Sequence, residues 1–254
     1  MDLDPHPVGM QFQFFGLSHL VALGTVLVAC LACPLLRPVL GASARRAVRL
    51  GLAALMFASE IGYLLWPVHA GNWTAREHLP LHLCAAMTFI GVAMLLTANR
   101  GLYAIVYFLG IGGATQAMVT PNLGEYGYPH ALFFALFVTH GTVVVAGVYM
   151  TVVEGFRPSW RSLWRVFVGM LAYTAVIGLV NFLLGSNYLF IAHKPETPSL
   201  IDLLGPWPWY ILPLTGVGLI TMVLLYSPFA IRDAWAARRA RGSALPLPAG
   251  APPP

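Results

Sequence analysis

Charged residues are scarce in this chain: only 9% of its 254 residues are Asp, Glu, Lys or Arg, whereas 58% are apolar. Soluble domains average roughly 25% charged residues, so this composition excludes a soluble globular fold. The mean hydropathy of +0.75 is typical of a membrane protein. The chain has three cysteines, an odd and small number that excludes a disulfide framework.

Several sequence motifs are also missing. Metal-ligand spacing such as H-E-x-x-H is absent, and we expect neither a metal nor a cofactor. Lys194 is the only lysine and lies between apolar runs, which excludes a retinal-type photoreceptor. Arginines are spread along the chain rather than gathered on one domain, so no nucleic-acid partner is expected. Phosphate-binding glycine loops are absent, and the run Gly110-Ile111-Gly112-Gly113 indicates close helix packing instead.

Long apolar runs dominate what remains. A hydrocarbon core about 30 Å thick requires about 20 apolar residues per helix. The runs are continuous rather than alternating, which excludes the strands of a membrane β-barrel. The sequence therefore predicts an all-α fold, a polytopic bundle of about seven transmembrane helices, at 14–36, 47–68, 79–98, 102–119, 131–153, 163–184 and 207–226.

The basic residues predict how this bundle is oriented. With seven spans, all of the fourteen Lys and Arg residues except Arg76 and Lys194 fall on one side of the membrane. Short basic loops stay in the cytoplasm, so we expect the N-terminus outside and the C-terminus inside the cell membrane. The first run has no basic flank or cleavage site and is predicted to be a retained helix.

This orientation also sets the expected domain organisation. Residues 1–13 form an extracytoplasmic segment, 14–228 the transmembrane domain, and 229–254 a basic, then Pro/Ala-rich cytoplasmic tail that is predicted to be disordered after Ala237. Aromatic residues in the predicted outer loops, Tyr188 among them, are typical of an interfacial belt, although they would also suit the entrance for a lipid-like substrate.

Polar side chains inside the spans are the candidate functional residues, because such groups normally face the interior of a bundle. Seven of them, contributed by six predicted helices, fall at a similar depth in the outer half of the membrane. His140 lies about 15 Å into its helix and would form the floor of one shared pocket. The seven are His19, Glu60, His82, Cys84, Gln116, His130 and Asn181.

Cys84 is the candidate nucleophile, because Pro80 suits the first turn of the predicted helix and would place the thiol near its positive end. Residues two apart on a helix point about 200° from each other, so His82 need not contact Cys84. The base is then His140 or His19. A buried core thiol and a histidine that merely ties helices together are the alternatives.

Two further polar features are open to more than one interpretation. Glu60 would either fix the tautomer of a histidine or take part in a proton relay. Cys30 and Cys33 form a C-x-x-C motif, but it has no second Cys/His pair beside it and is predicted to be structural.

Four short motifs carry a resemblance to a known family. They are Leu79-Pro80-Leu81-His82-Leu83-Cys84, Gly112-Gly113-Ala114-Thr115-Gln116-Ala117 with Thr120-Pro121-Asn122, Thr139-His140-Gly141, and the segment 203–210. In combination they resemble the YwaF / transmembrane protein 164 family over residues 14 to 228. Animal members are described as lipid acyltransferases with a cysteine nucleophile in a His-x-Cys motif and a membrane-embedded histidine.

The resemblance implies Cys84 as nucleophile, His140 as base and His82 as the histidine of the motif. Asn122 stands where the family often has aspartate, which argues against an acid there. The expected function is transfer of a fatty acyl group, with membrane lipids, a lysophospholipid and an acyl donor as partners and the oligomeric state left open.

Two other functions compete with this one. The first is a proton-coupled small-molecule transporter or sensor that uses Glu60 and the buried histidines. The second is a structural membrane protein whose polar groups only tie its helices together.

Overall fold

A computed structural model describes residues 11–124, 126–195 and 200–243, and within these ranges it contains helices and turns but no strand. The all-α prediction is confirmed. The elements follow in the order α1 (Leu17–Leu36), α2 (Ala42–His69), α3 (Leu83–Thr97), α4 (Arg100–Ile105), the π-helix η1 (Val106–Gly110), α5 (Ile111–Val119), α6 (Ala131–Val152), α7 (Trp160–Leu184), the 3-10 helices η2 (Tyr188–Phe190) and η3 (Leu200–Leu204), and α8 (Ile211–Ser243).

Six helical segments of the described chain are long and apolar enough to cross a membrane. One of them, Arg100–Val119, consists of α4, η1 and α5 in one continuous run. The third predicted span is α3, which has only 15 residues and is about 22 Å long. The molecule is therefore a polytopic helical membrane bundle, and its third helix is shorter than the sequence predicted.

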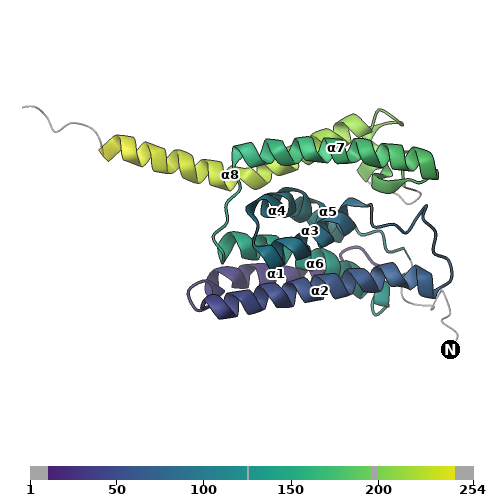
Figure 1. The fold of residues 1–254 in the computed structure, drawn as a ribbon, viewed down its shortest axis with the longest axis horizontal. Coiled ribbons are helices and arrows are strands. Elements are labelled where there is room, and N and C mark those ends of the chain that lie inside the picture. Colours follow the sequence, from purple (N-terminus) through teal and green to yellow (C-terminus); the bar gives the residue numbers. More distant parts are fainter. Residues whose placement is uncertain (1–10, 125, 196–199, 244–254) are drawn as a thin grey trace, which may run out of the picture.

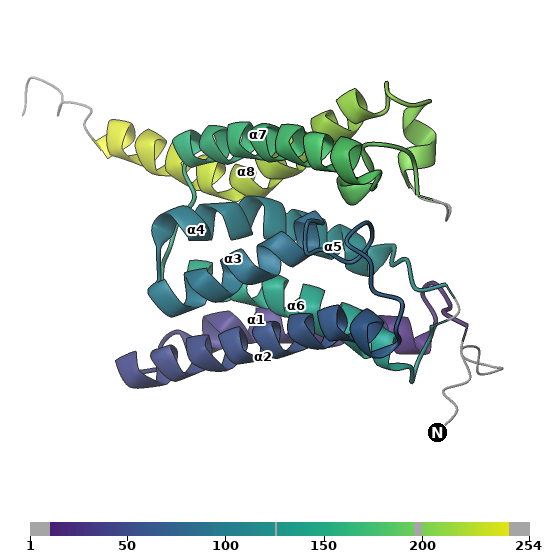
Figure 2. The same cartoon turned by 45° about the vertical axis from the view of Figure 1, so that its right-hand side comes forward.

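Helix α6 lies at the centre of the bundle, in contact with α1, α2, α3, η1 and α5. Helices α7 and α8 pair with each other and lie along the side formed by α4 and η1, as Figures 1 and 2 show. Glycines allow the close approaches around α6. A Cβ atom at Gly141 would lie 2.6 Å from Val26, and one at Gly147 would lie 2.8 Å from Ile111. Small residues at helix contacts are the usual means of close packing in a membrane.

The helix boundaries follow from local capping. The Asn99 side chain accepts hydrogen bonds from the amides of Gly101 and Leu102 at the start of α4. Ser159 and Ser162 form a reciprocal capping box at the start of α7, which Gly185 ends in a left-handed conformation with φ of 62°. Such caps satisfy the terminal backbone groups that a helix cannot pair internally. They explain why the predicted breaks lie close to the observed ones.

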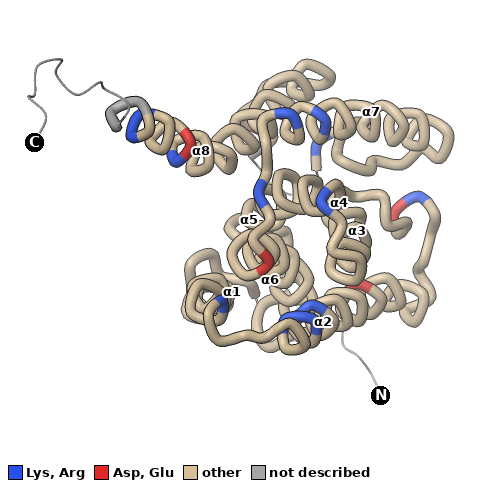
Figure 3. Tube along the Cα trace, turned by 60° about the vertical axis from the view of Figure 1, so that its left-hand side comes forward, with Lys and Arg blue, Asp and Glu red and all other residues tan. Residues whose placement is uncertain are grey.

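One end of the bundle is held together by arginines, and Figure 3 shows this end turned toward the viewer. Arg45 donates to three backbone carbonyls, those of Arg37, Leu40 and Val153, at 2.9, 3.0 and 3.2 Å. These contacts join the start of α2 to the ends of α1 and α6. The arginines that were predicted to share one membrane face thus include one that fixes the bundle at that face.

The C-terminal tail differs from the sequence prediction. Disorder was expected after Ala237, but α8 continues to Ser243. The reason is that residues 234–241 are mostly alanine and arginine, which are strong helix formers. The predicted Pro/Ala-rich end, 244–254, and most of the predicted N-terminal segment lie outside the described residues.

We expect replacement of Arg45 by alanine to destabilise the bundle, because three carbonyl groups lose their partner at once. The expected loss is about 1–3 kcal/mol, measured as a lower midpoint of thermal unfolding in detergent. Arg46→Ala is the matched control, because Arg46 is exposed next to it. Equal midpoints for the two variants would contradict a role of Arg45 in joining the helices.

The orientation of the bundle is tested separately. With the arginine-rich end in the cytoplasm, green fluorescent protein fused after the last residue is expected to fluoresce in bacterial cells. Alkaline phosphatase fused at the same position is expected to be inactive. The reverse pattern of the two reporters would show that the C-terminus lies outside.

Candidate active site

The first turn predicted for the third helix is not helical. Residues 79–82 form turns, and α3 begins at Leu83. The sequence predicted Pro80 in the first turn of this helix, but in the structure Pro80 lies before the helix begins. Cys84 is instead the second residue of α3, closer to the start of the helix than predicted.

This irregular segment is held by two tyrosines. The amide of Leu79 donates to the hydroxyl of Tyr188, and the hydroxyl of Tyr173 donates to the carbonyl of Leu81, both at 2.8 Å. Irregular backbone at membrane depth is tolerated only where protein groups or a cavity satisfy it. The two hydroxyls thereby allow α3 to begin inside the bundle.

A small cavity lies at the start of α3. Its walls come from α3, from η1 with α5, and from α6, and its volume is about 10 Å³. A cavity of this size holds at most about one water molecule. The residues that line it are Leu83, Cys84, Met87, Thr88, Leu109, Gly110, Gly113, Ala114, Thr139, His140 and Val143.

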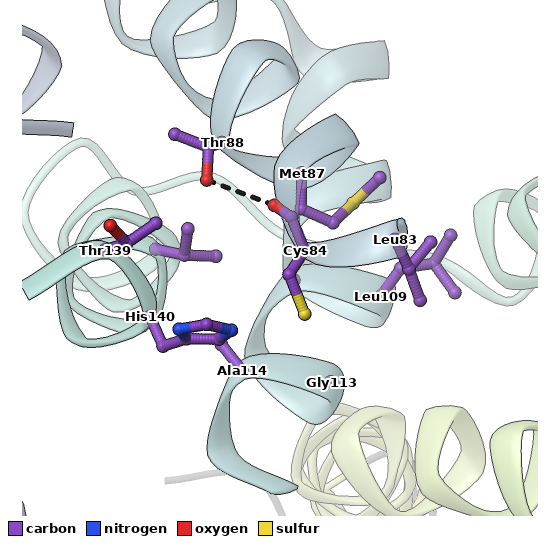
Figure 4. A pocket seen from close by; sticks show the side chains of 11 residues that line it. Leu83, Cys84, Met87, Thr88, Leu109, Gly113, Ala114, Thr139 and His140 are labelled. Atoms are coloured by element: carbon purple, nitrogen blue, oxygen red, sulfur yellow. Dashed lines mark hydrogen bonds between the residues drawn. The ribbon is translucent and has the colours of Figure 1, made fainter. Parts of the chain in front are cut away.

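Cys84 and His140 face this cavity together. In Figure 4 the sulfur of Cys84 points toward the α5 backbone at Gly113 and Ala114, and the imidazole of His140 lies beside the same space. The two side chains come from different helices, α3 and α6. The proposed nucleophile and its proposed base are therefore brought together by the fold.

The protonation pattern of His140 follows from one hydrogen bond. Its Nδ1 lies 2.8 Å from the carbonyl oxygen of Leu136. A carbonyl only accepts, so Nδ1 carries the proton and neutral His140 has its lone pair on Nε2. Among the described residues none hydrogen-bonds to Nε2. This arrangement orients a general base in the way that second-shell contacts orient catalytic histidines.

Two features of the surroundings of Cys84 have opposite effects on the stability of its thiolate. The start of a helix carries partial positive charge, and the His82 side chain makes no capping bond there, so amides of the first turn are available to a negative group. Burial among apolar side chains opposes a free charge. The geometry thus suits a thiolate that forms as its proton moves to a base.

Glu60 lies behind the cavity rather than in its wall. The residue is 4% exposed and is not among the residues that line the cavity. Thr88 donates to the carbonyl of Cys84 at 3.0 Å. The contact that fixes the tautomer of His140 comes from its own helix and not from Glu60, whereas a proton relay remains a hypothesis.

His19 lies outside the cavity. It is fully buried, its Nδ1 accepts from the amide of Phe15 at 2.9 Å, and its Nε2 lies 2.8 Å from the carbonyl of Met118. Both ring nitrogens are used, and the ring ties the start of α1 to the end of α5. Of the two candidate bases, the structure therefore favours His140.

Three other predicted residues do not line the cavity either. Gln116 is exposed and donates to Thr120 at 2.9 Å, so it is not placed to stabilise an oxyanion there. His130 is the N-cap of α6 and accepts from the amide of Leu132 at 3.1 Å. Asn122 is exposed. Similar depth along the helices did not mean one shared pocket, because these side chains point in different directions.

His82 and Asn181 support the site from outside the cavity. The His82 ring packs on Tyr188 and Phe190, with centroids 5.2 and 5.3 Å away. Asn181 donates to the carbonyl of Tyr188 at 2.9 Å and accepts from its amide at 2.8 Å. Asn181 therefore positions the tyrosine that holds the backbone ahead of Cys84.

Sequence reasoning missed the two tyrosines. Tyr188 was assigned to an interfacial belt, but it is 1% exposed and its hydroxyl also donates to the carbonyl of Ala75 at 2.8 Å. The sequence around Tyr188 gives no sign of this role, because the backbone groups that its hydroxyl contacts lie 109 and 113 positions earlier. No group of three potential metal ligands occurs within the described part of the chain.

Comparison with known proteins adds a family and one relative. The model described as the TMEM164 family matches residues 14–226. A protein of Treponema pallidum (strain Nichols), described as uncharacterized, is 28% identical over 225 residues, which cover 87% of this chain and 91% of that protein. No solved structure matches the chain.

We expect Asn181→Ala to lower stability by about 1–2 kcal/mol, because it removes the bonds to both backbone groups of a buried tyrosine, each worth about 0.6 kcal/mol in a membrane. The measurement is the thermal unfolding midpoint in detergent. Asn187→Ala is the control, because Asn187 makes a similar number of bonds within the same loop but is only half-buried. A larger loss for the control would overturn the role given to Asn181.

Proposed function

The chain belongs to the TMEM164 family, and from this premise we propose that it is a membrane-embedded acyltransferase. It moves a fatty acyl group between phospholipids and lysophospholipids in the cell membrane. Cys84 is the nucleophile and His140 the general base and acid. The observation that carries the proposal is that Cys84 and His140, from separate helices, line one cavity.

The first half of the reaction forms a thioester. Nε2 of His140 takes the thiol proton of Cys84 while the sulfur attacks the ester carbonyl of the acyl donor. The ester C–O bond breaks, and His140 returns the proton to the leaving alkoxide, which departs as a lysophospholipid. Backbone amides in the first turn of α3 are the nearest candidates to stabilise the oxyanion, and Gln116 is not.

The second half reverses these steps with a different acceptor. The hydroxyl of a second lysophospholipid gives its proton to His140 and attacks the thioester carbonyl. The C–S bond breaks, the new ester leaves, and the sulfur recovers a proton from His140. Because the cavity is lined mainly by apolar groups, which disfavour water, transfer to a lipid is favoured over hydrolysis.

The arrangement of His140 supports this assignment beyond simple proximity. A histidine that ties two helices together bonds across them, as His19 of α1 does with the carbonyl of Met118 in α5. His140 uses Nδ1 within its own helix and leaves Nε2 for a reacting proton. The fully buried His19 and the half-buried His140 thus differ in the feature that a general base requires.

We expect Cys84→Ala and His140→Ala each to reduce acyl exchange at least about 100-fold, because each removes a group that moves the reacting proton or carries the acyl chain. The assay follows exchange of an isotopically labelled acyl chain by purified protein in liposomes, read by mass spectrometry. In the wild type, a hydroxylamine-sensitive acyl adduct is expected on Cys84.

Cys30→Ala and His19→Gln are the controls, because they change the same residue types away from the cavity. Undiminished exchange in Cys84→Ala protein would end the thioester mechanism. Uptake or binding of a small molecule that depends on pH and on Glu60, but not on Cys84, would support the transporter or sensor instead.

A further inference from the structure

Some glycines inside the described helices have a packing reason, whereas others, such as Gly62, Gly169 and Gly216, have nothing within 4 Å of an added Cβ atom. A Cβ atom would lie 2.5 Å from Met56 if added at Gly91, 2.9 Å from Val143 at Gly110, and 2.8 Å from Thr221 at Gly112. These distances are too short for any larger residue without movement. Close packing, which the glycine run was predicted to serve, is thus confirmed at Gly110 and Gly112.

Gly113 lacks such a reason. A Cβ atom there would meet only the Cδ2 atom of Leu83, at 3.8 Å, which is an ordinary van der Waals contact. A glycine in a helix is less favourable than alanine by about 1 kcal/mol. Helix packing therefore leaves room at this position for at least one more carbon atom, and the glycine needs another explanation.

The position of Gly113 supplies that explanation. It lines the cavity that holds Cys84 and His140, and the sulfur of Cys84 points toward the backbone of α5 at this residue. The other walls carry side chains that fill space, such as Met87, Leu109 and Val143. Two glycines line the cavity: Gly110 in η1 packs closely on the side chain of Val143, whereas Gly113 in α5 has no such close contact.

The size of the cavity makes an opening necessary. Room for about one water molecule is sufficient for a reacting carbonyl group but not for the chain attached to it. A substrate with a long acyl chain must therefore extend beyond the cavity through part of its wall. At Gly113 only the Cδ2 atom of Leu83 lies within 4 Å of an added Cβ atom, so the end of one flexible side chain closes the wall there.

We propose that Gly113 is a specificity-determining residue, whose missing side chain leaves the passage along which the acyl chain of the substrate lies. This inference rests on the proposed acyl transfer and names the feature of the substrate that the site selects, a long apolar chain next to the carbonyl. A methyl group at 113 would contact Leu83 but neither Cys84 nor His140, so it narrows the passage while small reagents still reach the thiol.

The test measures access to Cys84 by alkylation, independently of acyl transfer. Full-length protein carrying Cys30→Ala and Cys33→Ala keeps Cys84 as its single thiol. It is treated in liposomes with N-ethylmaleimide or N-dodecylmaleimide, and the adduct is followed by intact mass. In each case the sulfur of Cys84 forms a bond to one carbon of the C=C bond in the maleimide ring, and the thiol proton moves to the other carbon.

We expect Gly113→Leu to slow the reaction with the dodecyl reagent about tenfold or more, as overpacking of a tight site would, while the ethyl reagent keeps its rate. Gly113→Ala is expected to show a smaller loss in the same direction, and it serves if the leucine variant does not fold. Gly62→Leu is the matched control, because Gly62 lies in helix α2 with nothing within 4 Å of an added Cβ. That control is expected to change neither rate.

Three results would contradict the proposed passage. In the first, both Gly113 variants slow alkylation by the two reagents equally; in the second, neither variant changes either alkylation rate. In the third, Cys84 reacts with neither reagent when Gly113 is unchanged. Acyl exchange separates the two proposals. Selective alkylation without any exchange would remove the proposed function and leave the passage, whereas exchange in Gly113→Leu protein with unchanged preference for long acyl chains would remove the passage alone.

Discussion

The site depends on one constraint: backbone polar groups within a bilayer must find partners inside the protein. An α3 that began at Leu79 would satisfy this constraint by itself. The chain instead leaves four residues irregular and satisfies them with the hydroxyls of Tyr173 and Tyr188. Because of this, the start of α3 lies inside the bundle, and Cys84 occupies its first turn beside a histidine from the middle of α6.

The same constraint explains why residues distant from the cavity matter to it. Asn181 occupies both backbone groups of Tyr188, and Tyr188 in turn bonds to the backbone at Ala75 and Leu79. The position of the thiol is therefore set by a chain of hydrogen bonds that begins near the end of α7. In a membrane such bonds average only about 0.6 kcal/mol each, so their combined geometry matters more than any single contact.

Sequence reasoning predicted the helices well and the directions of their side chains poorly. Hydropathy gave the helices, and Cys84 and His140 were singled out by their positions along them. The direction of a side chain around its helix depends on packing that a single sequence does not contain, so Gln116 and His19 were grouped with Cys84 although neither lines the cavity. The start of α3 was also missed, because the partners that permit its late start lie in α7 and η2, about one hundred positions later.

Gly113 shows that glycines in one sequence run can have different surroundings in the fold. In sequence, Gly110, Gly112 and Gly113 form a single run that is typical of close helix contacts. In the fold, an added carbon atom would clash at the first two positions and would have ordinary contacts at the third. Gly113 is smaller than its packing requires and lines a cavity too small for a lipid chain, and the proposed passage of the acyl chain accounts for both features.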